Sequence, residues 1–535
     1  MRFRAGLLTT LLLLLAGCGG DGAEKAAAPP AEQVLRWGII GESGPDDTSW
    51  DALTDIPINT PWNVFDPLVK VDEELQAVPN VAERWEWSED RRTITFHLRR
   101  DGRWTNGDPL TAHDYVFGWR HTLQEDRPSE SAGIFSVIAG ADAYISCDPE
   151  KRECEPLWDD VGVRALDDHT LEVRLTEPQP WFPDIVGGFS CVCFSGLHRE
   201  TVERYGDDWA EPEHIVTSGP FKVESWSRDE LLVLVRNEQW RGAADVALER
   251  IEIRFFRERK MADAVRAFEA GELDVTDAQV GAEEHRAVYP FLKTQFVAVD
   301  VEKVPDARQR RAMALAVDRR TIVEKVPVGE ARAGTSVTPD GMPGFGRIAS
   351  RFLEPDARLE EARRLLAAVP EPHRTIELWA VDLPVWRAEA TEIAAAWRRL
   401  GIETTVRALP WDEFSKQVPT RRLGEAVLAN WVYDAPDPAN LYDQFRCGDQ
   451  YYPLGYCDPV YDDLLDRAAR EPDAEARLGL YAQAEARLTG REGTMPVIPL
   501  WWGSRTRLES ASARETFELN KAGQVDLTKV RLRGG

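Results

Sequence analysis

The sequence predicts a mixed α/β protein with a strand-rich first half and a second half in which strands and helices alternate. Two early segments show the two-residue alternation of half-buried strands, and later segments repeat apolar residues at helical spacing. The composition, 43% hydrophobic and 29% charged, is ordinary for a globular protein. A chain of 535 residues can bury one large core or about two to three smaller ones.

The N-terminus has the pattern of an export signal. Residues 1–4 contain two arginines, residues 7–15 are mostly apolar, and two small residues precede Cys18. The apolar run is shorter than the roughly 20 residues that span a bilayer. The ending resembles the bacterial lipobox, so we expect a signal peptide over 1–17 and a lipid on Cys18. The alternative is an ordinary secretory signal in which Cys18 is incidental. Residues 18–31 are rich in Gly, Ala and Pro and are expected to form a flexible tether.

The net charge excludes one class of partner. The chain carries a formal charge of −27, whereas nucleic-acid binders present basic patches. We therefore expect no nucleic-acid partner and interpret the charge as a mutually repelling, soluble surface.

The cysteines other than Cys18 fall into three close pairs. They are Cys147 and Cys154, Cys191 and Cys193, and Cys447 and Cys457. The first and the last pair each bracket a polar loop, and in an oxidising compartment such spacing predicts disulfides. Whether Cys191 and Cys193 are bonded stays open, because a single intervening residue gives awkward geometry. No Cys-x-x-Cys pair with matching His is present, so no metal site is predicted.

Strands are predicted at residues 93–99 and 170–175. In the first, Ile94, Phe96 and Leu98 would face one side, and the second has the same alternation. Turn sequences lie beside both segments, so we expect antiparallel strands in this half.

The second half predicts an α/β arrangement. Amphipathic helices are expected from Met261 to Phe268, ending at Gly271, and from Ala390 to Leu400, ending at Gly401. Further strands and helices follow the same reasoning. The strands are 376–381, 402–406 and 426–431, and the helices are near 464–468 and 478–488.

No catalytic motif is evident. The chain lacks a Gly-x-Ser-x-Gly elbow, a Walker loop and a His-Glu-x-x-His motif, so we expect neither an enzyme nor a cofactor. Its 92 acidic residues prevent a carboxylate pair from being identified by spacing. The 19 tryptophans are mostly expected in the core, although a few could line a ligand cleft.

A series of ordered motifs carries a family resemblance. They are residues 79–85, 95–99, 104–112, 114–116, 167–173, 218–221, 236–237 with Trp240, 271–274, 431–434, 437–438 and 496–500. In this order and spacing the chain resembles the family 5 solute-binding proteins, the oligopeptide- and dipeptide-binding proteins of bacterial ABC importers. The resemblance covers nearly all of the mature chain and is nearest to the oligopeptide-binding type.

The resemblance implies a periplasmic binding protein-like fold of type II. In this large cluster two lobes enclose a cleft and an extra strand-rich domain is present. The expected division is 32–66 with 185–285 and 500–535 for the first lobe, 67–184 for the extra domain, and 286–499 for the second lobe.

The implied function is capture of short peptides for an ABC importer. A monomer on a lipid anchor would close on a peptide and deliver it to a permease complex of two membrane subunits and ATPases. One alternative is the same scaffold with another cargo, such as a metal chelate, haem, a sugar oligomer or an antibiotic. Another is a lipid-anchored hydrolase, for which no constellation is found.

The resemblance also implies ligand-binding residues. Asp434 matches the aspartate that pairs with the ligand's α-amino group, and Trp411 matches a tryptophan near the cleft. Residues 434–438 also suit a turn, in which Asp437 is expected to be structural. Backbone groups of two extended segments are expected to pair with the ligand, and further tryptophans are candidates. These residues are Asn430, Trp431, Val432 and Tyr433, then Ile58 and Asn59, and finally Trp501 and Trp502.

The chain departs from the family pattern at two places. Leu428 stands where similar oligopeptide binders carry a basic residue, so capture of a ligand carboxylate by that route is in doubt. Arg407 or Lys416 could substitute for it. The stretch 301–308 is also shorter than its family counterpart.

Overall fold

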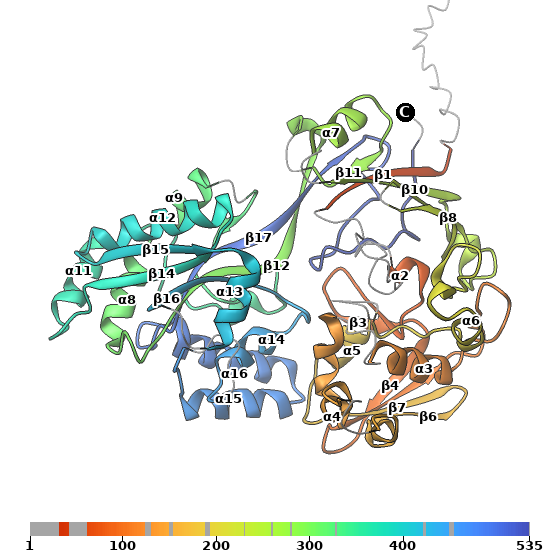
Figure 1. Ribbon diagram of the computed structural model, residues 1–535, viewed down its shortest axis with the longest axis horizontal. Coiled ribbons are helices and arrows are strands. Elements are labelled where there is room, and N and C mark those ends of the chain that lie inside the picture. The colour runs from red at the N-terminus through yellow and green to blue at the C-terminus, as the bar shows by residue number, and fades with distance from the viewer. Residues whose placement is uncertain are drawn as a thin grey trace, which may run out of the picture.

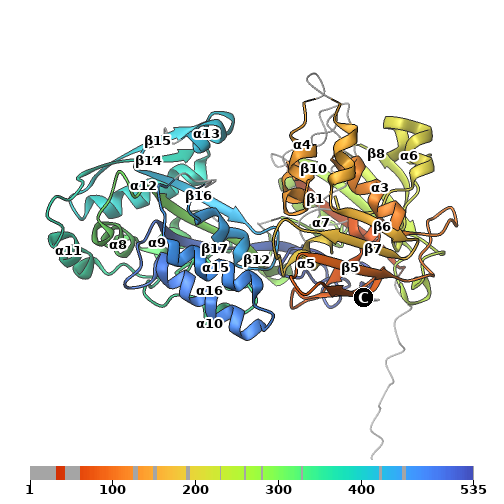
Figure 2. The same ribbon diagram turned by 90° about the horizontal axis from the view of Figure 1, so that it is seen from below.

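The computed structural model describes residues 32–41, 61–123, 130–148, 153–187, 193–228, 230–257, 261–278, 281–326, 329–420, 424–448 and 454–533. The signal peptide, Cys18, the tether, Ile58, Asn59 and Cys191 lie outside these residues. Within them the chain forms two lobes joined by two long strands, with a region built on a smaller sheet beside the first lobe (Figures 1 and 2). No helix among these residues is long and apolar enough to cross a membrane.

One large sheet runs through both lobes. Its strand order is β15-β14-β16-β12-β17-β11-β1-β10-β9-β8, with β13 paired to β17. The strands are β1 (Val34–Gly41), β8 (Phe221–Ser227), β9 (Leu231–Arg236), β10 (Arg250–Arg257), β11 (Val275–Thr276), β12 (Arg286–Val299), β13 (Arg332–Ala333), β14 (Thr375–Val381), β15 (Glu403–Leu409), β16 (Ala426–Val432) and β17 (Val497–Glu509). The strands β8 to β11 and β1 belong to the first lobe, and β14 to β16 belong to the second.

The hinge strands β12 and β17 connect the lobes as an antiparallel pair (Figure 1). Their register shifts between the pairs Pro290–Ser504 and Thr294–Trp502, where 291–293 of β12 face only Gly503 of β17. Extra residues on one strand of a pair bend it and disrupt the ladder locally. The break therefore gives the connection between the lobes a place to bend.

Two helices contact the strands of the first lobe: α2 (Pro61–Val64) contacts β8, and α7 (Met261–Glu269) contacts β1, β10 and β11. A third helix, α6 (Arg199–Tyr205), contacts α3 (Ala112–Thr122) of the region built on the smaller sheet. The predicted helix from Met261 is confirmed, and Gly271 beyond its end has a φ of +73° that favours glycine. At the centre the fully buried Trp37 meets Phe517 edge-on, with ring centroids 5.3 Å apart.

The small-sheet region comprises the strands and helices between Val69 and Val186. Its elements are β2 (Val69–Val71), β3 (Ala77–Pro79), β4 (Ala82–Trp87), β5 (Thr93–Leu98), β6 (Val163–Asp167), β7 (Thr170–Arg174), α3 (Ala112–Thr122), α4 (Ala141–Ile145) and α5 (Phe182–Val186). Both predicted strands are confirmed as the antiparallel pair β5 and β7, and Ile94, Phe96 and Leu98 are buried as expected. The predicted disulfide Cys147–Cys154 is present.

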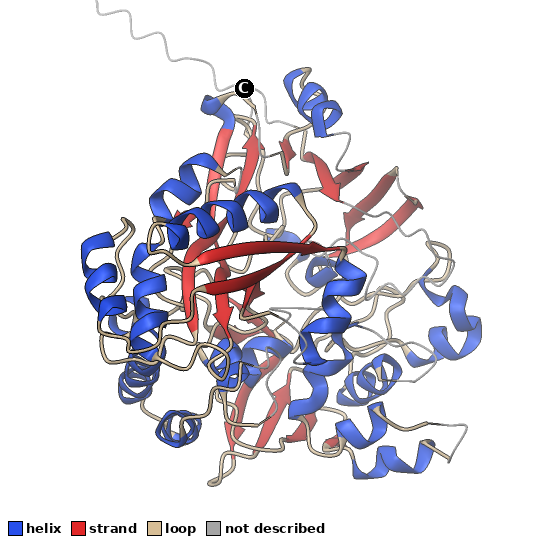
Figure 3. Cartoon of the chain, turned by 60° about the vertical axis from the view of Figure 1, so that its left-hand side comes forward, coloured by secondary structure: helices blue, strands red, loops and turns tan. Residues whose placement is uncertain are grey.

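The second lobe is an α/β layer structure. Its helices are α8 (Ala307–Ala316), α9 (Arg319–Lys325), α10 (Phe345–Ile348), α11 (Leu359–Ala367), α12 (Pro384–Arg398), α13 (Trp411–Gln417), α14 (Ala439–Tyr442), α15 (Pro459–Arg470) and α16 (Ala474–Thr489). All the strands and helices predicted for this half are confirmed, and α12 packs against β14 and β15. Figure 3, in which this lobe comes forward, shows helices on either side of its strands.

Cysteines later in the chain are also disulfide-bonded. The predicted Cys447–Cys457 bond is confirmed. Cys193 is disulfide-bonded as well.

Candidate functional site

The end of β16 emerges from the core beside the hinge. Residues 426–429 of this strand are buried, whereas Val432 is 44% exposed. β16 pairs antiparallel with β12, so Val432 lies opposite Lys293 and Asn430 opposite Gln295. The predicted backbone segment 430–433 is thus the accessible end of a strand next to the connection between the lobes.

Asp434 follows this strand and is half-buried. Its backbone N–H donates to Oδ1 of Asn440 (3.0 Å), the atom that also accepts from Nε1 of Trp431 (2.8 Å). Burial raises the pKa of the Asp434 carboxyl, and a hydrogen bond from the Asn440 side chain opposes this rise. No ion pair to Asp434 occurs among the described residues. A desolvated carboxylate without a cation is suited to a charged ammonium group.

Tyr433 and Trp502 hold a neighbouring segment in place. The Tyr433 hydroxyl donates to the carbonyl of Val337 (3.1 Å), and Nε1 of Trp502 donates to the carbonyl of Ser336 (2.9 Å). Tyr433 is 3% exposed and Trp502 is 7% exposed. In this conformation both rings are buried and serve packing.

Trp501 is engaged on the opposite face of the hinge strands. Its Nε1 donates to Oε1 of Glu389 (2.7 Å), and Nε2 of Gln295 donates to the other carboxylate oxygen (2.9 Å). Burial raises the pKa of Glu389 to about 7, against the effect of these hydrogen bonds. Trp501 and Trp502 therefore lie in two different environments although they are neighbours in sequence.

Trp411 begins α13 and is 59% exposed. Its ring stacks on Phe414, with centroids 6.2 Å apart. Of the predicted aromatic residues, this one has a ring face available for a ligand.

The structure explains the departure at Leu428. This side chain is fully buried in the core of the second lobe, so the position offers no cation to the site. Arg407 already has partners, since its guanidinium lies 3.8 Å from Glu377 and 4.5 Å from the Trp379 ring centroid. Lys416 is exposed on α13. Asp437 accepts a hydrogen bond from the Ala439 N–H (2.8 Å) at the start of α14, which fits a structural role.

Sequence reasoning missed Asn440, Gln295 and Lys293. Asn440 accepts hydrogen bonds from both Trp431 and Asp434 and so fixes their relative positions. Asn is too common in turns for the sequence to single this residue out. Gln295 and Lys293 lie on β12, whose second half is buried without alternation, so the strand carried no periodic signal.

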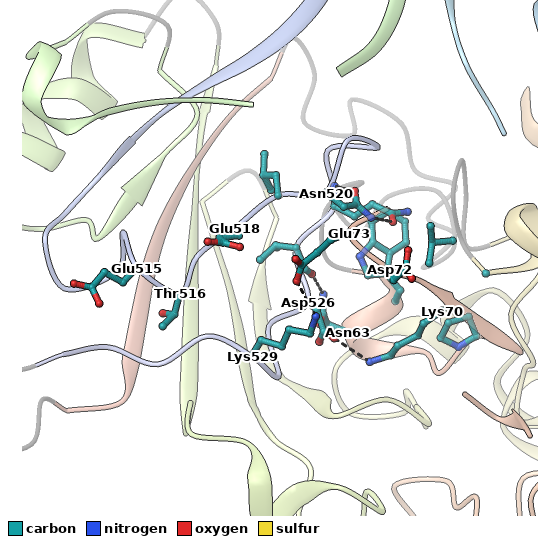
Figure 4. A pocket seen from close by; sticks show the side chains of 17 residues that line it. Asn63, Lys70, Asp72, Glu73, Glu515, Thr516, Glu518, Asn520, Asp526 and Lys529 are labelled. Atoms are coloured by element: carbon teal, nitrogen blue, oxygen red, sulfur yellow. Dashed lines mark hydrogen bonds and ion pairs between the residues drawn. The ribbon is translucent and has the colours of Figure 1, made fainter. Parts of the chain in front are cut away.

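A cavity of about 270 Å³ lies elsewhere, between the C-terminal segment and the small-sheet region. Two ion pairs cross its wall, Lys70 with Asp526 at 3.5 Å and Lys529 with Glu73 at 3.2 Å (Figure 4). Asp434 is not among its lining residues. The described part of the chain holds no group of His, Cys, Asp and Glu that could bind a metal.

Two lobes on hinge strands, with a carboxylate that has no ion pair among the described residues at a strand end beside the hinge, are typical of a solute-binding protein. The chain belongs to the bacterial extracellular solute-binding proteins, family 5: residues 76–453 match the family description "Bacterial extracellular solute-binding proteins, family 5 Middle". The proteins of this family are non-catalytic.

Several curated relatives match along most of their length. The periplasmic oligopeptide-binding protein OppA of Salmonella typhimurium is 29% identical, with 92% of each chain covered. The probable deoxycholate-binding periplasmic protein YgiS of Escherichia coli is also 29% identical, with 88% of each chain covered. The dipeptide-binding protein DppE of Bacillus subtilis is 26% identical and covers 98% of this chain and 97% of its own.

Solved structures confirm the predicted fold class. The murein tripeptide-binding protein MppA in its unliganded open form has a TM-score of 0.77 at 23% identity, covering 95% of this chain and 99% of that one. Haemophilus influenzae OppA in complex with the peptide RPPGFSPFR has a TM-score of 0.64 at 22% identity, covering 94% and 99%.

Proposed function

We propose that the protein is the lipid-anchored substrate-binding component of an ABC importer and that its ligands are short peptides. The observation that carries this proposal is Asp434, a half-buried carboxylate with no ion pair among the described residues, at the open end of β16. The names of the relatives support it, because OppA and DppE are named for binding oligopeptides and dipeptides.

Each part of a peptide has a counterpart in this site. The ammonium end would meet Asp434, where a charge-assisted contact offsets the loss of water. The peptide backbone would pair with the exposed end of β16 near Val432, an interaction that does not depend on side-chain identity. The exposed ring of Trp411 would cover apolar side chains.

Closure would complete the site. In the proposed division, 286–499 moves as the second lobe against the first lobe (32–66, 185–285 and 500–535) and the extra domain (67–184). The register break in the hinge strands supports this motion, because a locally disrupted ladder bends at small cost.

The test of Asp434 compares peptides with free and with acetylated amino ends. Asp434→Asn keeps the shape and removes the charge, so the affinity for a free-amino tripeptide should fall by about 100-fold. The affinity for the N-acetylated peptide should change little, as measured by isothermal titration calorimetry. Asp463→Asn, at an exposed position of α15, is the matched control. Equal losses for both peptides would contradict the assigned role.

One relative favours a second candidate ligand. YgiS is named as a probable deoxycholate-binding protein at an identity equal to that of OppA. A carboxylate-bearing amphiphile has no ammonium group for Asp434, but it would suit the aromatic surface of Trp411. Native mass spectrometry of the purified protein distinguishes the two candidate ligands. Co-purified peptides would give a series of ligand masses, whereas an amphiphile would give a single mass.

The lipid anchor is tested at Cys18. Growth with labelled palmitate should label the wild-type protein and not Cys18→Ala, which should move from the membrane to the soluble extracytoplasmic fraction. Identical fractionation of the two proteins would favour the ordinary secretory signal.

A further inference from the structure

Two half-buried cations lie on the hinge strands close to the register break. Lys293 of β12 and Arg505 of β17, here called the hinge cation pair, are half-buried and form no ion pair within the described ranges. The chain has 92 acidic and 65 basic residues, so carboxylates are abundant. Two neighbouring half-buried cations without an ion pair are therefore unexpected in such a chain.

The two side chains flank one glycine on the same face of the strands. The Lys293 ammonium lies 5.3 Å from the Trp501 ring centroid, and the Arg505 guanidinium lies 4.3 Å from that of Phe291. Between them is Gly503, where an added Cβ would come within 2.9 Å of the Lys293 Cβ. The glycine lets Lys293 lie close to β17, because the Lys293 Cβ, Cγ and Cδ occupy the place that a side chain at 503 would take.

The nearby carboxylates are engaged elsewhere. Glu389 acts on Lys293 only at longer range and accepts hydrogen bonds from Trp501 and Gln295. Asp277 acts on Arg505 in the same way and forms its ion pair with Arg507 at 2.8 Å. Neither carboxylate lies within ion-pair distance of the hinge cation pair.

The electrostatics of the hinge cation pair favour binding of an anion. Burial lowers the pKa of Lys293, and the charge of Arg505 lowers it further. Burial lowers the pKa of Arg505 to about 10, and its Nε is buried without a hydrogen-bond partner. An anion placed between the two side chains would relieve both effects and would supply the missing acceptor.

We propose that the hinge cation pair binds the carboxylate group of the solute, in place of the basic residue that Leu428 replaces. The proposal rests on the proposed function, in which Asp434 holds the opposite, amino end of the ligand. Lys293 lies directly opposite Val432, two residues before Asp434, so both charged positions belong to the same end of the β12–β16 pair.

The position of the pair would couple binding to closure. Arg505 pairs with Tyr289 on the first-lobe side of the register break, whereas Lys293 lies in the break and pairs with Val432 of β16 in the second lobe. A carboxylate held by both cations would bridge the break. The ligand would then stabilise one bend of the hinge over others, which is the differential interaction that a population shift requires.

The test compares free acids with their amides. Tri- to penta-alanine and their C-terminal amides are titrated into the wild type, Lys293→Met, Arg505→Met and the control Lys325→Met, which lies exposed on α9. The wild type should bind the free acids about 10- to 100-fold more tightly than the amides, as expected for hydrogen bonds to a charged group. Each hinge variant should lose this preference and bind the amides like the wild type. Lys325→Met should keep the preference, and melting temperatures without ligand verify folding.

Equal wild-type affinity for acid and amide would overturn the proposal while leaving the peptide function intact. Equal loss of both ligands in the hinge variants would overturn it as well. If no alanine peptide binds the wild type, the peptide function fails, and deoxycholate and its methyl ester replace the peptides. If the hinge variants bound deoxycholate more weakly and the methyl ester as well as the wild type does, this result would still support carboxylate binding by the hinge cation pair. Failure to bind any of these probes would overturn both proposals.

Discussion

At the scale of single residues, two desolvated carboxylates beside the hinge differ in what they contact. Glu389 receives hydrogen bonds from Trp501 and Gln295, which use its two oxygens inside the fold. Asp434 has only the Asn440 side chain among the described residues. The first is satisfied without a ligand, whereas the second retains capacity for one more charged donor.

The raised pKa of Asp434 predicts a pH dependence of binding. Above this pKa the carboxylate is ionised and the contact with an ammonium is fully present. As the pH falls through it, the carboxylate is protonated and the contact is lost. Affinity for a free-amino peptide should therefore decline on acidification at a pH above the ordinary aspartate value of 3.8. Calorimetry between about pH 4 and pH 7 measures this.

The control for this prediction must account for Glu389, whose pKa of about 7 falls in the same range. The N-acetylated peptide reports changes that do not involve the ammonium contact. Asp434→Asn should give the same profile for both peptides, and a decline that is larger for the free-amino peptide in this variant would assign the decline to another group.

At the scale of elements, the hinge strands depend on close packing at their register break. Gly503 has no positive φ that would demand glycine, so the requirement is steric. The contact with Lys293 leaves no room for a methyl group unless the strands separate.

Gly503→Ala should therefore destabilise the protein by about 1–3 kcal/mol, the usual cost of overpacking. Urea unfolding measures the change in the free energy of unfolding. Gly346→Ala is the matched control, because an added Cβ there meets nothing within 4 Å. If both substitutions have the same effect, the close approach at the hinge does not matter for stability.

At the scale of the whole molecule, two lobes are connected by the hinge strands β12 and β17 (Figure 1). The register break between Pro290 and Thr294 lies in this connection, where a locally disrupted ladder can bend.

A bound peptide should bring the lobes together. Small-angle X-ray scattering should show a smaller radius of gyration when a saturating peptide is added, because closure moves mass toward the hinge. Asp434→Asn at the same peptide concentration should show a smaller change, in proportion to the fraction bound. An unchanged radius at saturation would indicate that binding does not close this protein.

The sequence by itself determined the elements whose burial is one-sided. β5 and β7 alternate between a buried and an exposed face, and α12 and α15 bury one stripe, so period and burial agree. The ordered motifs determined the family, and the short cysteine spacings predicted two disulfides correctly, since so few residues bring both thiols within reach.

Only the tertiary structure decided how the hinge and the site are assembled. The second half of β12 is buried on both faces and lies between β16 and β17, which follow it by more than a hundred residues, so neither period nor local sequence marks it. The unpaired state of Asp434, Lys293 and Arg505 is likewise a property of three-dimensional neighbours. A sequence shows that a charge exists, but whether another charge meets it depends on segments brought together by the core.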